Sequence, residues 1–402
     1  MSTLRLKLRN HNPLVILTLL WFFGSQFSYW QQRTASLHFG LQNSTFAYSC
    51  KPIVMKDIFA KRLKSARALA GLSQDELVER MDGLVSKNAI SKYERGEMMA
   101  DSKVLIALAK ALEVKTDYFF RPFTVEISNI EFRKKKKLRQ RELKSIKERV
   151  SDTIERYLEV EQFLNIKSEF KNPIANHTIN NGQDVEHAVN TLLNEWKWGI
   201  NALPNVIELL EDKEIKVVEL EAPLEFDGFS GWADAKFPIV VINKNYTMVR
   251  KRLTALHELG HLLLNFHESI EHKIVEKLCF RFAGAMLMPE ETFKMEMGEE
   301  RSRISVAELV SIKETYGISI QAIMARAKDL GVITAYSYIN FCKWIARNRK
   351  EEGLGEYRGR ESSDRFTQLL YRAASEEIIS MSKAANLANQ KLAAFRKDFM
   401  AV

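Results

Sequence analysis

The sequence predicts a mainly α-helical protein with a small mixed sheet, an α+β fold divided over several domains. Three observations lead to this prediction. Short helical segments with clear capping residues follow one another between residues 55 and 123, and a longer amphipathic helix is expected after them. In the second half, strand-like segments precede an H-E-x-x-H motif. A chain of 402 residues is long enough for two or three such domains.

Composition places the chain among globular proteins. Hydrophobic residues make up 46% and charged residues 28% of the sequence, which excludes an intrinsically disordered chain. The three cysteines, Cys50, Cys279 and Cys342, are too few and too scattered for a disulfide framework. We therefore expect a reducing compartment and a cytoplasmic protein.

Charge is distributed unevenly along the chain. Residues 55–150 hold 23 Lys and Arg against 14 Asp and Glu, whereas residues 151–402 hold 32 against 37. An excess of positive charge in one segment is typical of a module that faces the phosphates of a nucleic acid. The remainder of the chain is expected to serve another purpose.

Residues 1–54 differ from the rest of the sequence. They contain five basic residues and no acidic one, and residues 14–23 are almost wholly apolar. That run is about half the length that a helix needs to cross a bilayer, although a basic start with a short apolar core resembles a signal peptide. We interpret residues 1–54 as a non-native extension or leader, expect translation to begin at Met55, and expect no stable membrane association.

Five short helices are expected between residues 55 and 123. Gly71 ends the first, which covers residues 56–70, and Ser73 with Glu76 forms a capping box for the second. After an Asp82-Gly83 turn, Ser86 is expected to cap a third helix that runs to Tyr93, and Gly96 follows the end of that helix. Asp101 is expected to cap a fourth helix over residues 102–112, and Thr116 a last short turn.

These helices carry a specific motif. Its parts are Arg62-Leu63-Lys64, Gly71-Leu72-Ser73-Gln74 and the segment from Val85 to Glu94-Arg95-Gly96. The motif resembles an Xre/Cro-type helix-turn-helix domain, which we assign to residues 55–123. The resemblance implies double-stranded DNA as a partner, a homodimer on the DNA, and a third helix in the major groove.

The same resemblance implies individual DNA contacts. Lys87, Asn88 and Lys92 would face bases, because Lys donates to guanine and Asn can pair with adenine. Gln74, Ser86 and Arg95 would contact phosphates, and Arg62 would form a partly buried ion pair with Glu94. The alternative is that the three base-facing residues only solvate an exposed helix face.

Residues 124–184 are expected to form a basic helical linker. Residues 133–141 contain seven Lys and Arg, and they lead into a helix with apolar residues at Leu143, Ile146, Val150, Ile154, Tyr157 and Leu158. The basic run either contacts DNA beside the recognised site or solvates the linker. Residues 170–173 and 176–184 indicate a flexible boundary.

His257, Glu258 and His261 form an H-E-x-x-H motif inside an apolar helical segment. Residues four apart on a helix point to one side, so both imidazoles can bind the same zinc ion. Glu258 is then placed to take a proton from metal-bound water. A third ligand is needed, and His267 and Glu276 are both candidates. The Gly that metzincins place three residues after the second histidine is replaced here by Leu264.

The segment from Glu276 to Ala283 and on to Leu287-Met288-Pro289 resembles the second signature of the ImmA/IrrE family of metallopeptidases. The resemblance implies a zincin-like domain over residues 185–331, one Zn²⁺ held by His257, His261 and Glu276, and Glu258 as the catalytic residue. Cys279 and Phe280 depart from the common Ala and Asn. His267 and His272 are then expected to be exposed or to lie around the ligands.

The same resemblance implies further elements upstream of this motif. Residues 192–198 and 207–210 are read as helices, 215–220 and 238–243 as strands, and 226–231 as a turn. Residues 229–235 are expected to form an edge strand near the metal, to which an extended substrate could add by backbone pairing. Residues 332–402 are expected to form additional helices of unknown role.

Three functions are compatible with these motifs. The first is a DNA-binding transcriptional regulator with a zinc endopeptidase that cleaves a repressor-type protein in a stress or mobile-element response. The second is a transcription factor whose metallopeptidase-like domain only senses a ligand or partner. The third is an antitoxin-like regulator.

Overall fold

The computed structural model describes residues 55–122, 125–132, 139–347 and 351–400. The interpretation of residues 1–54 and most of the basic run at 133–141 lie outside the described residues. Where the structure is described, no helix is both long enough and apolar enough to span a membrane.

The first described segment folds into the five short helices that were expected. They are α2 (Met55–Leu69), α3 (Gln74–Arg80), α4 (Lys87–Glu94), α5 (Ser102–Ala111) and the 3-10 helix η1 (Thr116–Phe120). Ser73, Ser86 and Asp101 each accept a hydrogen bond from a backbone N–H in the first turn of α3, α4 and α5, which confirms three predicted caps. Thr116 is not a cap. Lys115 occupies that position without a side-chain hydrogen bond.

These helices enclose a small apolar core. Phe59, Leu63, Leu77, Ile90 and Phe119 are completely buried in it. They come from α2, α3, α4 and η1, so the periodic apolar positions of each helix meet at one centre.

A four-stranded mixed sheet follows, with strand order β1-β4-β5-β3. The strands are β1 (Ile127–Phe132), β3 (Lys216–Leu220), β4 (Gly228–Ala233) and β5 (Phe237–Asn243). Strands β3 and β5 are parallel, whereas β4 runs antiparallel to both β5 and β1. The two strands predicted near residues 215–220 and 238–243 are therefore confirmed.

The prediction of an edge strand at residues 229–235 is wrong. Strand β4 lies inside the sheet because β1, from the expected linker, pairs with its outer side. The expected turn at 226–231 is also wrong in its second half, since residues from Gly228 onward already belong to β4. The actual turn lies between β4 and β5, where Asp234 and Ala235 both have positive φ. Two such residues in succession make the tight turn that suits a hairpin.

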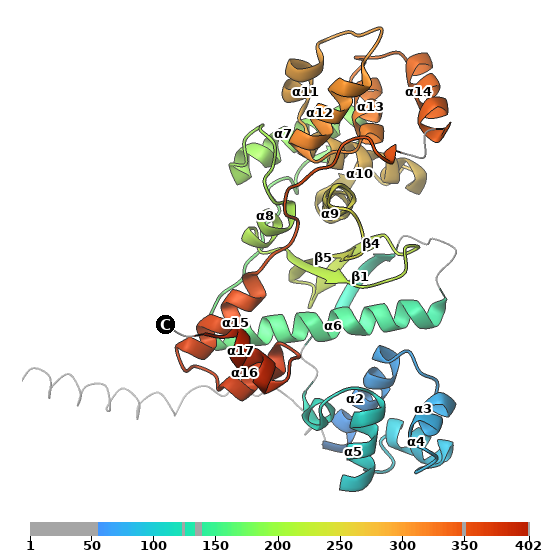
Figure 1. Cartoon of the computed structure of the whole chain (residues 1–402), viewed down its shortest axis with the longest axis vertical. Coiled ribbons are helices and arrows are strands. Elements are labelled where there is room, and N and C mark those ends of the chain that lie inside the picture. Colours follow the sequence, from blue (N-terminus) through green and yellow to red (C-terminus); the bar gives the residue numbers. More distant parts are fainter. Residues whose placement is uncertain (1–54, 123–124, 133–138, 348–350, 401–402) are drawn as a thin grey trace, which may run out of the picture. The chain divides into compact units, whose positions relative to one another are not determined.

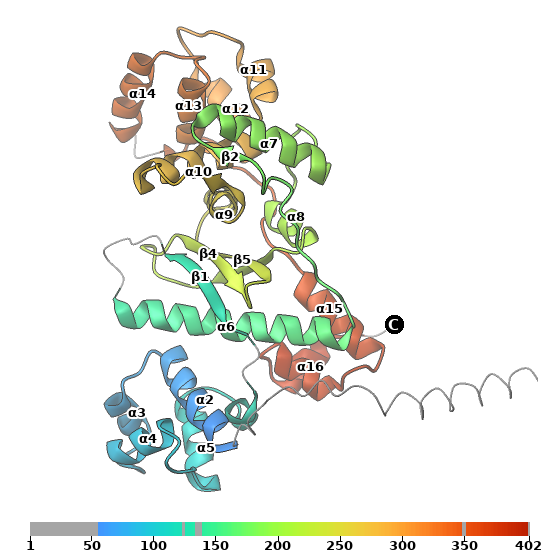
Figure 2. The ribbon, with the colours of Figure 1, turned by 180° about the vertical axis from the view of Figure 1, so that it is seen from behind.

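The sheet is covered on both faces by long helices (Figures 1 and 2). One is α6 (Gln140–Phe163), whose predicted apolar positions Ile146, Val150 and Ile154 pack on one face. The other is α9 (Met248–Leu263), which packs on the opposite face against β4 and β5. The predicted linker thus contributes a strand and a helix to the layered core that contains the H-E-x-x-H helix.

Further helices surround α9. They are α7 (Gly182–Trp196), α8 (Val206–Asp212), α10 (His272–Leu287), α11 (Glu290–Met297), α12 (Val306–Tyr316) and α13 (Ile320–Asp329). A two-stranded parallel pair, β2 (Thr178–Ile179) with β6 (Asn265–Phe266), joins the start of α7 to the end of α9. The flexible boundary expected at 176–184 is therefore wrong, because this segment pairs as β2 and then begins α7.

The last helices divide between two cores. Phe341 and Ile345 of α14 (Ala335–Arg347) join the core around α9. The helices α15 (Arg365–Ser375), α16 (Met381–Leu387) and α17 (Leu392–Asp398) form a separate cluster that also includes Val160 of α6. The mainly helical fold with a small mixed sheet is confirmed.

Candidate metal centre and DNA-reading helix

The H-E-x-x-H motif lies in the middle of α9. Thr247 is the N-cap of this helix, and its side chain accepts a hydrogen bond from the backbone N–H of Arg250. His257 and Glu258 are completely buried, and the side chain of His261 is 4% exposed. Burial of three polar side chains within five residues costs free energy unless each has a polar partner or a metal ion. The partners of these three side chains therefore indicate the function of the segment.

His257, His261 and Glu276 bring their ligand atoms together. The Nε2 atoms of the two histidines are 3.0 Å apart. One carboxylate oxygen of Glu276 lies 3.6 Å from the His257 Nε2, and the other lies 3.3 Å from the His261 Nε2. Ligands at about 2.0–2.2 Å from a tetrahedral zinc ion are separated by about 3.3–3.6 Å. The two distances from Glu276 fall within this range and the distance between the imidazole nitrogens is slightly shorter, so the three residues are close enough together to hold one metal ion.

The alternative ligand does not share this arrangement. His267 is exposed, and its Nδ1 lies 2.8 Å from the hydroxyl oxygen of Ser269. His272 is exposed at the start of α10. Among the described residues, the group of three with metal-ligand geometry is His257, His261 and Glu276. Of the two candidates for the third ligand, geometry favours Glu276.

Close packing of α9 on α10 produces this arrangement. A Cβ atom on Gly260 would lie 3.2 Å from the ring of Phe282 and 3.4 Å from the Cα of Cys279. Gly260, one of the unspecified positions of the motif, thus allows α10 to approach until Glu276 reaches both imidazoles. Burial raises the pKa of the neighbouring Cys279 thiol, so the neutral form is favoured there.

Glu258 follows His257 directly on α9, and one of its carboxylate oxygens contacts the sheet. Its Oε2 accepts a hydrogen bond of 3.1 Å from the hydroxyl of Ser230 on β4. A Cβ atom on Gly228 would lie only 2.5 Å from the carbonyl oxygen of Val241, so this glycine permits the close approach of β4. The sequence alone did not single out Ser230, because nothing local indicates that its strand crosses over α9 at Glu258.

Phe280 lies at the edge of the centre. Its ring centroid is 4.3 Å from that of His257, and its side chain is 44% exposed. It also lines a cavity of about 1320 Å³, together with Leu253 of α9 and Lys277 and Arg281 of α10. Where the family signature commonly has Asn, this chain places an aromatic ring against the imidazole and beside a cavity large enough for a peptide segment.

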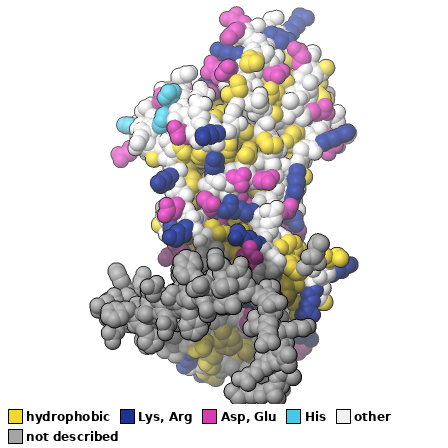
Figure 3. Space-filling model, turned by 90° about the vertical axis from the view of Figure 1, so that its left-hand side faces the viewer, with side chains coloured by type: hydrophobic (Ala, Val, Ile, Leu, Met, Phe, Trp, Pro, Cys, Tyr) yellow, Lys and Arg dark blue, Asp and Glu magenta, His cyan; other side chains and the backbone are white. Residues whose placement is uncertain are grey.

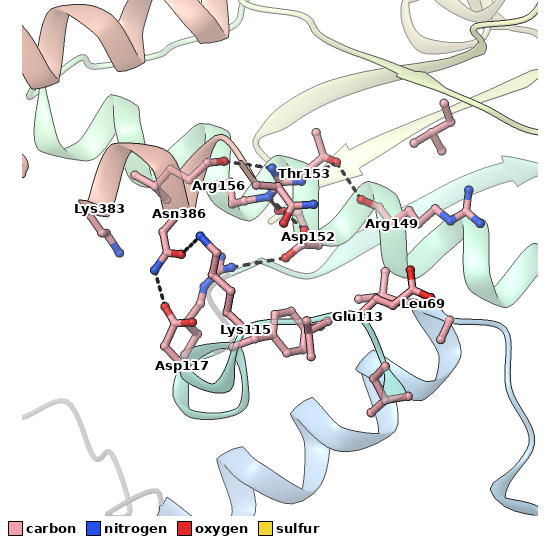
Figure 4. A pocket seen from close by; sticks show the side chains of 18 of the residues that line it. Leu69, Glu113, Lys115, Asp117, Arg149, Asp152, Thr153, Arg156, Lys383 and Asn386 are labelled. Carbon is pink, nitrogen blue, oxygen red and sulfur yellow. Dashed lines mark hydrogen bonds and ion pairs between the residues drawn. The ribbon is translucent and has the colours of Figure 1, made fainter. Parts of the chain in front are cut away.

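A second cavity, of about 560 Å³, lies where α6, α16 and the end of the N-terminal helical domain meet (Figure 4). Its polar side chains bind one another. Asn386 accepts a hydrogen bond from Lys115 and donates one to Asp117, and Arg121 pairs with Asp152. These contacts tie η1 to the C-terminal helices and explain why charged residues gather there.

Helix α4 presents the residues that the sequence assigned to base contacts. Lys87, Asn88 and Lys92 are all exposed, while Ile90 and Tyr93 hold the opposite side of the helix in the core. Asn88 and Lys92 are four residues apart and share one face. Lys87 forms an ion pair of 2.7 Å with Asp75 on α3. The helix can therefore offer an exposed polar face to a groove.

The three residues assigned to phosphate contacts also have partners within the domain. Gln74 donates to Glu94, Ser86 caps α4, and Arg95 binds Glu97 and Ser91. In the part of Figure 3 that grey atoms leave uncovered, basic and acidic side chains are interspersed rather than segregated. Any DNA contact by Gln74 or Arg95 would thus exchange an existing hydrogen bond for one to a phosphate.

The expected ion pair between Arg62 and Glu94 is wrong. Arg62 instead binds Glu155 of α6 at 2.8 Å, and Glu94 binds Arg67 at 2.6 Å. Arg67 lies one turn and a half further along α2, close enough to α4 to take the position that the resemblance gave to Arg62. Arg62 is thereby available to join the N-terminal domain to the long helix.

Comparisons with known proteins match both regions. Residues 63–119 match the family described as helix-turn-helix, and residues 210–328 match the peptidase family described as IrrE N-terminal-like domain. Over 58 residues the chain is 40% identical to the HTH-type transcriptional regulator ImmR of Bacillus subtilis (strain 168). That match covers 14% of this chain and 44% of the relative. The chain therefore spans less than half the length of this curated relative.

Proposed function

The chain joins an Xre-type helix-turn-helix domain to an IrrE-like domain of the metallopeptidase type, and on this premise we propose that it is a DNA-binding regulator with a zinc-dependent endopeptidase activity. Residues 55–123 would bind double-stranded DNA, and residues 185–331 would cleave a protein; β1 lies at the edge of the sheet in this second part, and α6 packs on one face of that sheet. The observation that carries the proposal is the convergence of His257, His261 and Glu276 beside Glu258.

The chemistry follows from the donor set. His257, His261 and Glu276 would hold a zinc ion, and the bound ion would supply a water molecule with a strongly lowered pKa. Glu258 would take up the proton of the attacking water and deliver it to the leaving amine. Ser230, which donates to one oxygen of Glu258, would hold the carboxylate in that orientation.

We propose a repressor-type protein as the substrate, in a cytoplasmic stress or mobile-element response. The reason is the fusion itself, because a regulator that reads DNA and cleaves a protein can act on the control of the genes it occupies. Asn88 and Lys92, together with Lys87, would read bases from α4. A homodimer is expected on DNA because such domains read paired half-sites.

A Glu258→Gln variant tests the enzyme. It keeps the shape of the side chain and the hydrogen-bond capacity near Ser230 but cannot accept the proton. We expect wild-type binding of zinc and of DNA selected from a random library, and at least a hundred-fold loss of proteolysis. Mapping of new protein N-termini in cells that express either form would also identify the substrate.

The control is a Glu268→Gln variant, which removes an exposed carboxylate ten residues away. It should cleave as the wild type does. Identical sets of cleaved termini in wild-type and Glu258→Gln cells would discard the proposed mechanism. Loss of zinc from the Glu258→Gln protein would instead show that Glu258 has a role in metal binding.

A further inference from the structure

We infer that β1 is a built-in inhibitor: this strand occupies the edge of β4 to which an extended substrate would add, so that proteolysis requires β1 to leave. The inference rests on the proposed peptidase function and specifies how that site is regulated. It arises from the corrected sheet order, because the strand expected at the edge is covered by a segment of the same chain.

The pairing of β1 with β4 uses the backbone groups that a substrate would need. Asp234 donates its backbone N–H to the carbonyl of Glu126 at 2.8 Å, which makes these residues a hydrogen-bonded pair. Hydrogen-bonded pairs alternate along an antiparallel ladder, so Ser128 and Trp232 form the next one. A second peptide cannot bind the same N–H and C=O groups while β1 remains in place.

The occupied edge lies next to the catalytic centre. Ser230, whose hydroxyl binds Glu258, is paired with Glu131 of β1. Adjacent strands are about 4.8 Å apart, so β1 runs one strand spacing from the strand that touches the proposed base. An extended peptide can add to an exposed sheet edge by backbone pairing, and β1 takes that place on β4.

Several contacts anchor β1. The backbone N–H of Glu126 donates to the carboxylate of Asp234 in the β4–β5 turn, at 2.7 Å. Ile127 is 6% exposed, in the same core as Ile146 and Val150 of α6. The hydroxyl of Ser128 adds a long contact of 3.5 Å to the carbonyl of Trp232.

The ladder nevertheless contains a weak point. Its register shifts between Ser128 and Glu131, which leaves an irregularity in the middle of a six-residue strand. Such a bulge interrupts the ladder of hydrogen bonds. A short strand with an interrupted ladder can leave the edge without unfolding the rest of the sheet, as a reversible inhibitor must.

A reversible lock tests the inference in the full chain. Ile127 and Ala233 form the non-hydrogen-bonded pair, where Cα atoms lie about 4.5 Å apart and a disulfide can close. The pair Ile127→Cys and Ala233→Cys should join β1 to β4 when oxidised and free it when reduced. The oxidised and reduced forms of the same protein are each other's control, and wild type with and without reductant controls for Cys279 and Cys342.

A second variant loosens the strand. Ser128→Pro removes a backbone N–H that faces β4, whereas Ser128→Ala keeps it and serves as the matched control. Loss of one such hydrogen bond corresponds to a change of about ten-fold in the population of the open state. An unchanged circular dichroism spectrum and a cooperative denaturation transition would show that the variant protein is folded.

Two readouts are needed. The first is binding of a fluorescein-labelled peptide of residues 125–132 to the metal-free full chain, and the second is cleavage of labelled β-casein by the zinc-loaded chain. We expect both to rise about ten-fold in Ser128→Pro relative to Ser128→Ala. Both should fall at least ten-fold in the oxidised lock relative to its reduced form.

The outcomes separate the two proposals. Peptide binding that follows this order without any cleavage supports occupation of the edge by β1 and overturns the peptidase. Cleavage that is equal in the oxidised and reduced lock overturns the inference and leaves the peptidase standing. Absence of peptide binding in a folded Ser128→Pro protein also overturns the inference.

Discussion

Small residues decide how closely the elements of the metal centre approach one another. Gly260 allows α10 to lie against α9, and Gly228 allows β4 to lie beside β5 and α9. The motif places two candidate ligands on one helix, and the glycines leave room for α10 with the third candidate and for β4 with the partner of Glu258 to approach that helix. Space at two glycines is therefore as necessary as the identity of the ligands.

Matched glycine substitutions test this at the residue scale. Gly260→Ala would place a Cβ atom 3.2 Å from Phe282, whereas Gly284→Ala on α10 meets its nearest neighbour, the Cδ of Arg326, at 3.8 Å. We expect Gly260→Ala to lower the free energy of unfolding by about 1–3 kcal/mol through overpacking. Gly284→Ala should raise it by about 0.5–1 kcal/mol through better helix propensity.

Chemical denaturation measures both variants, and zinc titration shows whether the site is disturbed. Gly260→Ala should also weaken zinc binding, because Glu276 moves away with α10. If the two substitutions change stability in the same direction and by the same amount, close packing at Gly260 is not what brings α10 to the metal.

The exposed face of α4 gives a second prediction at this scale. Asn88→Ala should lose about 1–3 kcal/mol of discrimination at one base pair of the recognised site, because an amide can form two hydrogen bonds to adenine. Fluorescence anisotropy with DNA sites selected from a random library measures the change. Lys103→Ala, which removes an exposed lysine from α5, is the matched control and should leave base preference intact.

At the scale of elements, Glu76 connects α3 to α6. It closes the capping box of α3 with Ser73, and it pairs with Arg141 at the start of α6 at 2.6 Å. The hydrogen bond from Arg141 and the backbone hydrogen bond from Ser73 lower the pKa of Glu76 from 4.5 to about 2. The cap and the contact with α6 thus depend on the same carboxylate.

The pH dependence of stability follows from this lowered pKa. A carboxyl group with a lowered pKa in the folded state stabilises the protein above its unfolded value of 4.5, and this contribution is lost as pH falls towards about 2. Glu76→Gln should therefore reduce the slope of unfolding free energy against pH within that range. Glu79→Gln, a surface carboxylate of the same helix, is the control. If Glu76→Gln leaves this slope unchanged, the lowered pKa of Glu76 does not stabilise the folded state.

Elements that depend on local signals could be predicted from sequence. The caps at Ser73, Ser86 and Asp101 and the apolar positions of α6 are set by neighbours within a few residues, so their patterns are visible in the chain. Two metal-ligand candidates four residues apart are visible for the same reason. The cap at Thr116 failed by one residue, as helix ends often do.

Features that depend on distant pairing could not be predicted. Strand β1 pairs with β4 across about a hundred residues, and nothing near Ile127 indicates that partner. The partner of Arg62 was predicted from a resemblance to single-domain helix-turn-helix motifs, in which no α6 is present to offer Glu155. Ser230 was missed because its role arises where a strand crosses a helix, not from its sequence neighbours.

At the scale of the whole molecule, α6 is shared by the DNA-binding and peptidase parts. One of its sides packs on the sheet, and its Glu155 binds Arg62 of α2 with both side chains almost completely buried. Arg62 also donates to the backbone carbonyls of Arg121 and Pro122, just before β1 begins. Arg121 and Pro122, which precede β1 in the chain, are therefore held by α2 through the same side chain that binds α6.

The ion pair is suited to such a link because it is costly to break. Burial raises the pKa of Glu155, and the neighbouring Arg62 and Arg121 act in the opposite direction. Removal of one partner from a buried ion pair costs about 3–5 kcal/mol, whereas replacement of both by apolar residues is often neutral. We therefore expect α2 and α6 to separate only when the whole ion pair breaks, so that the two parts of the protein unfold together.

We therefore predict that Arg62→Met uncouples the two parts. Hydrogen exchange at increasing denaturant should show α2–α5 opening before α9 in this variant, and both together in the wild type. The double variant Arg62→Met with Glu155→Met should restore joint unfolding, because it leaves no buried charge behind. Lys61→Met, at an exposed neighbour on α2, controls for the substitution itself. If α2–α5 and α9 still unfold together with an unchanged midpoint in Arg62→Met, the buried pair does not couple DNA binding to the peptidase.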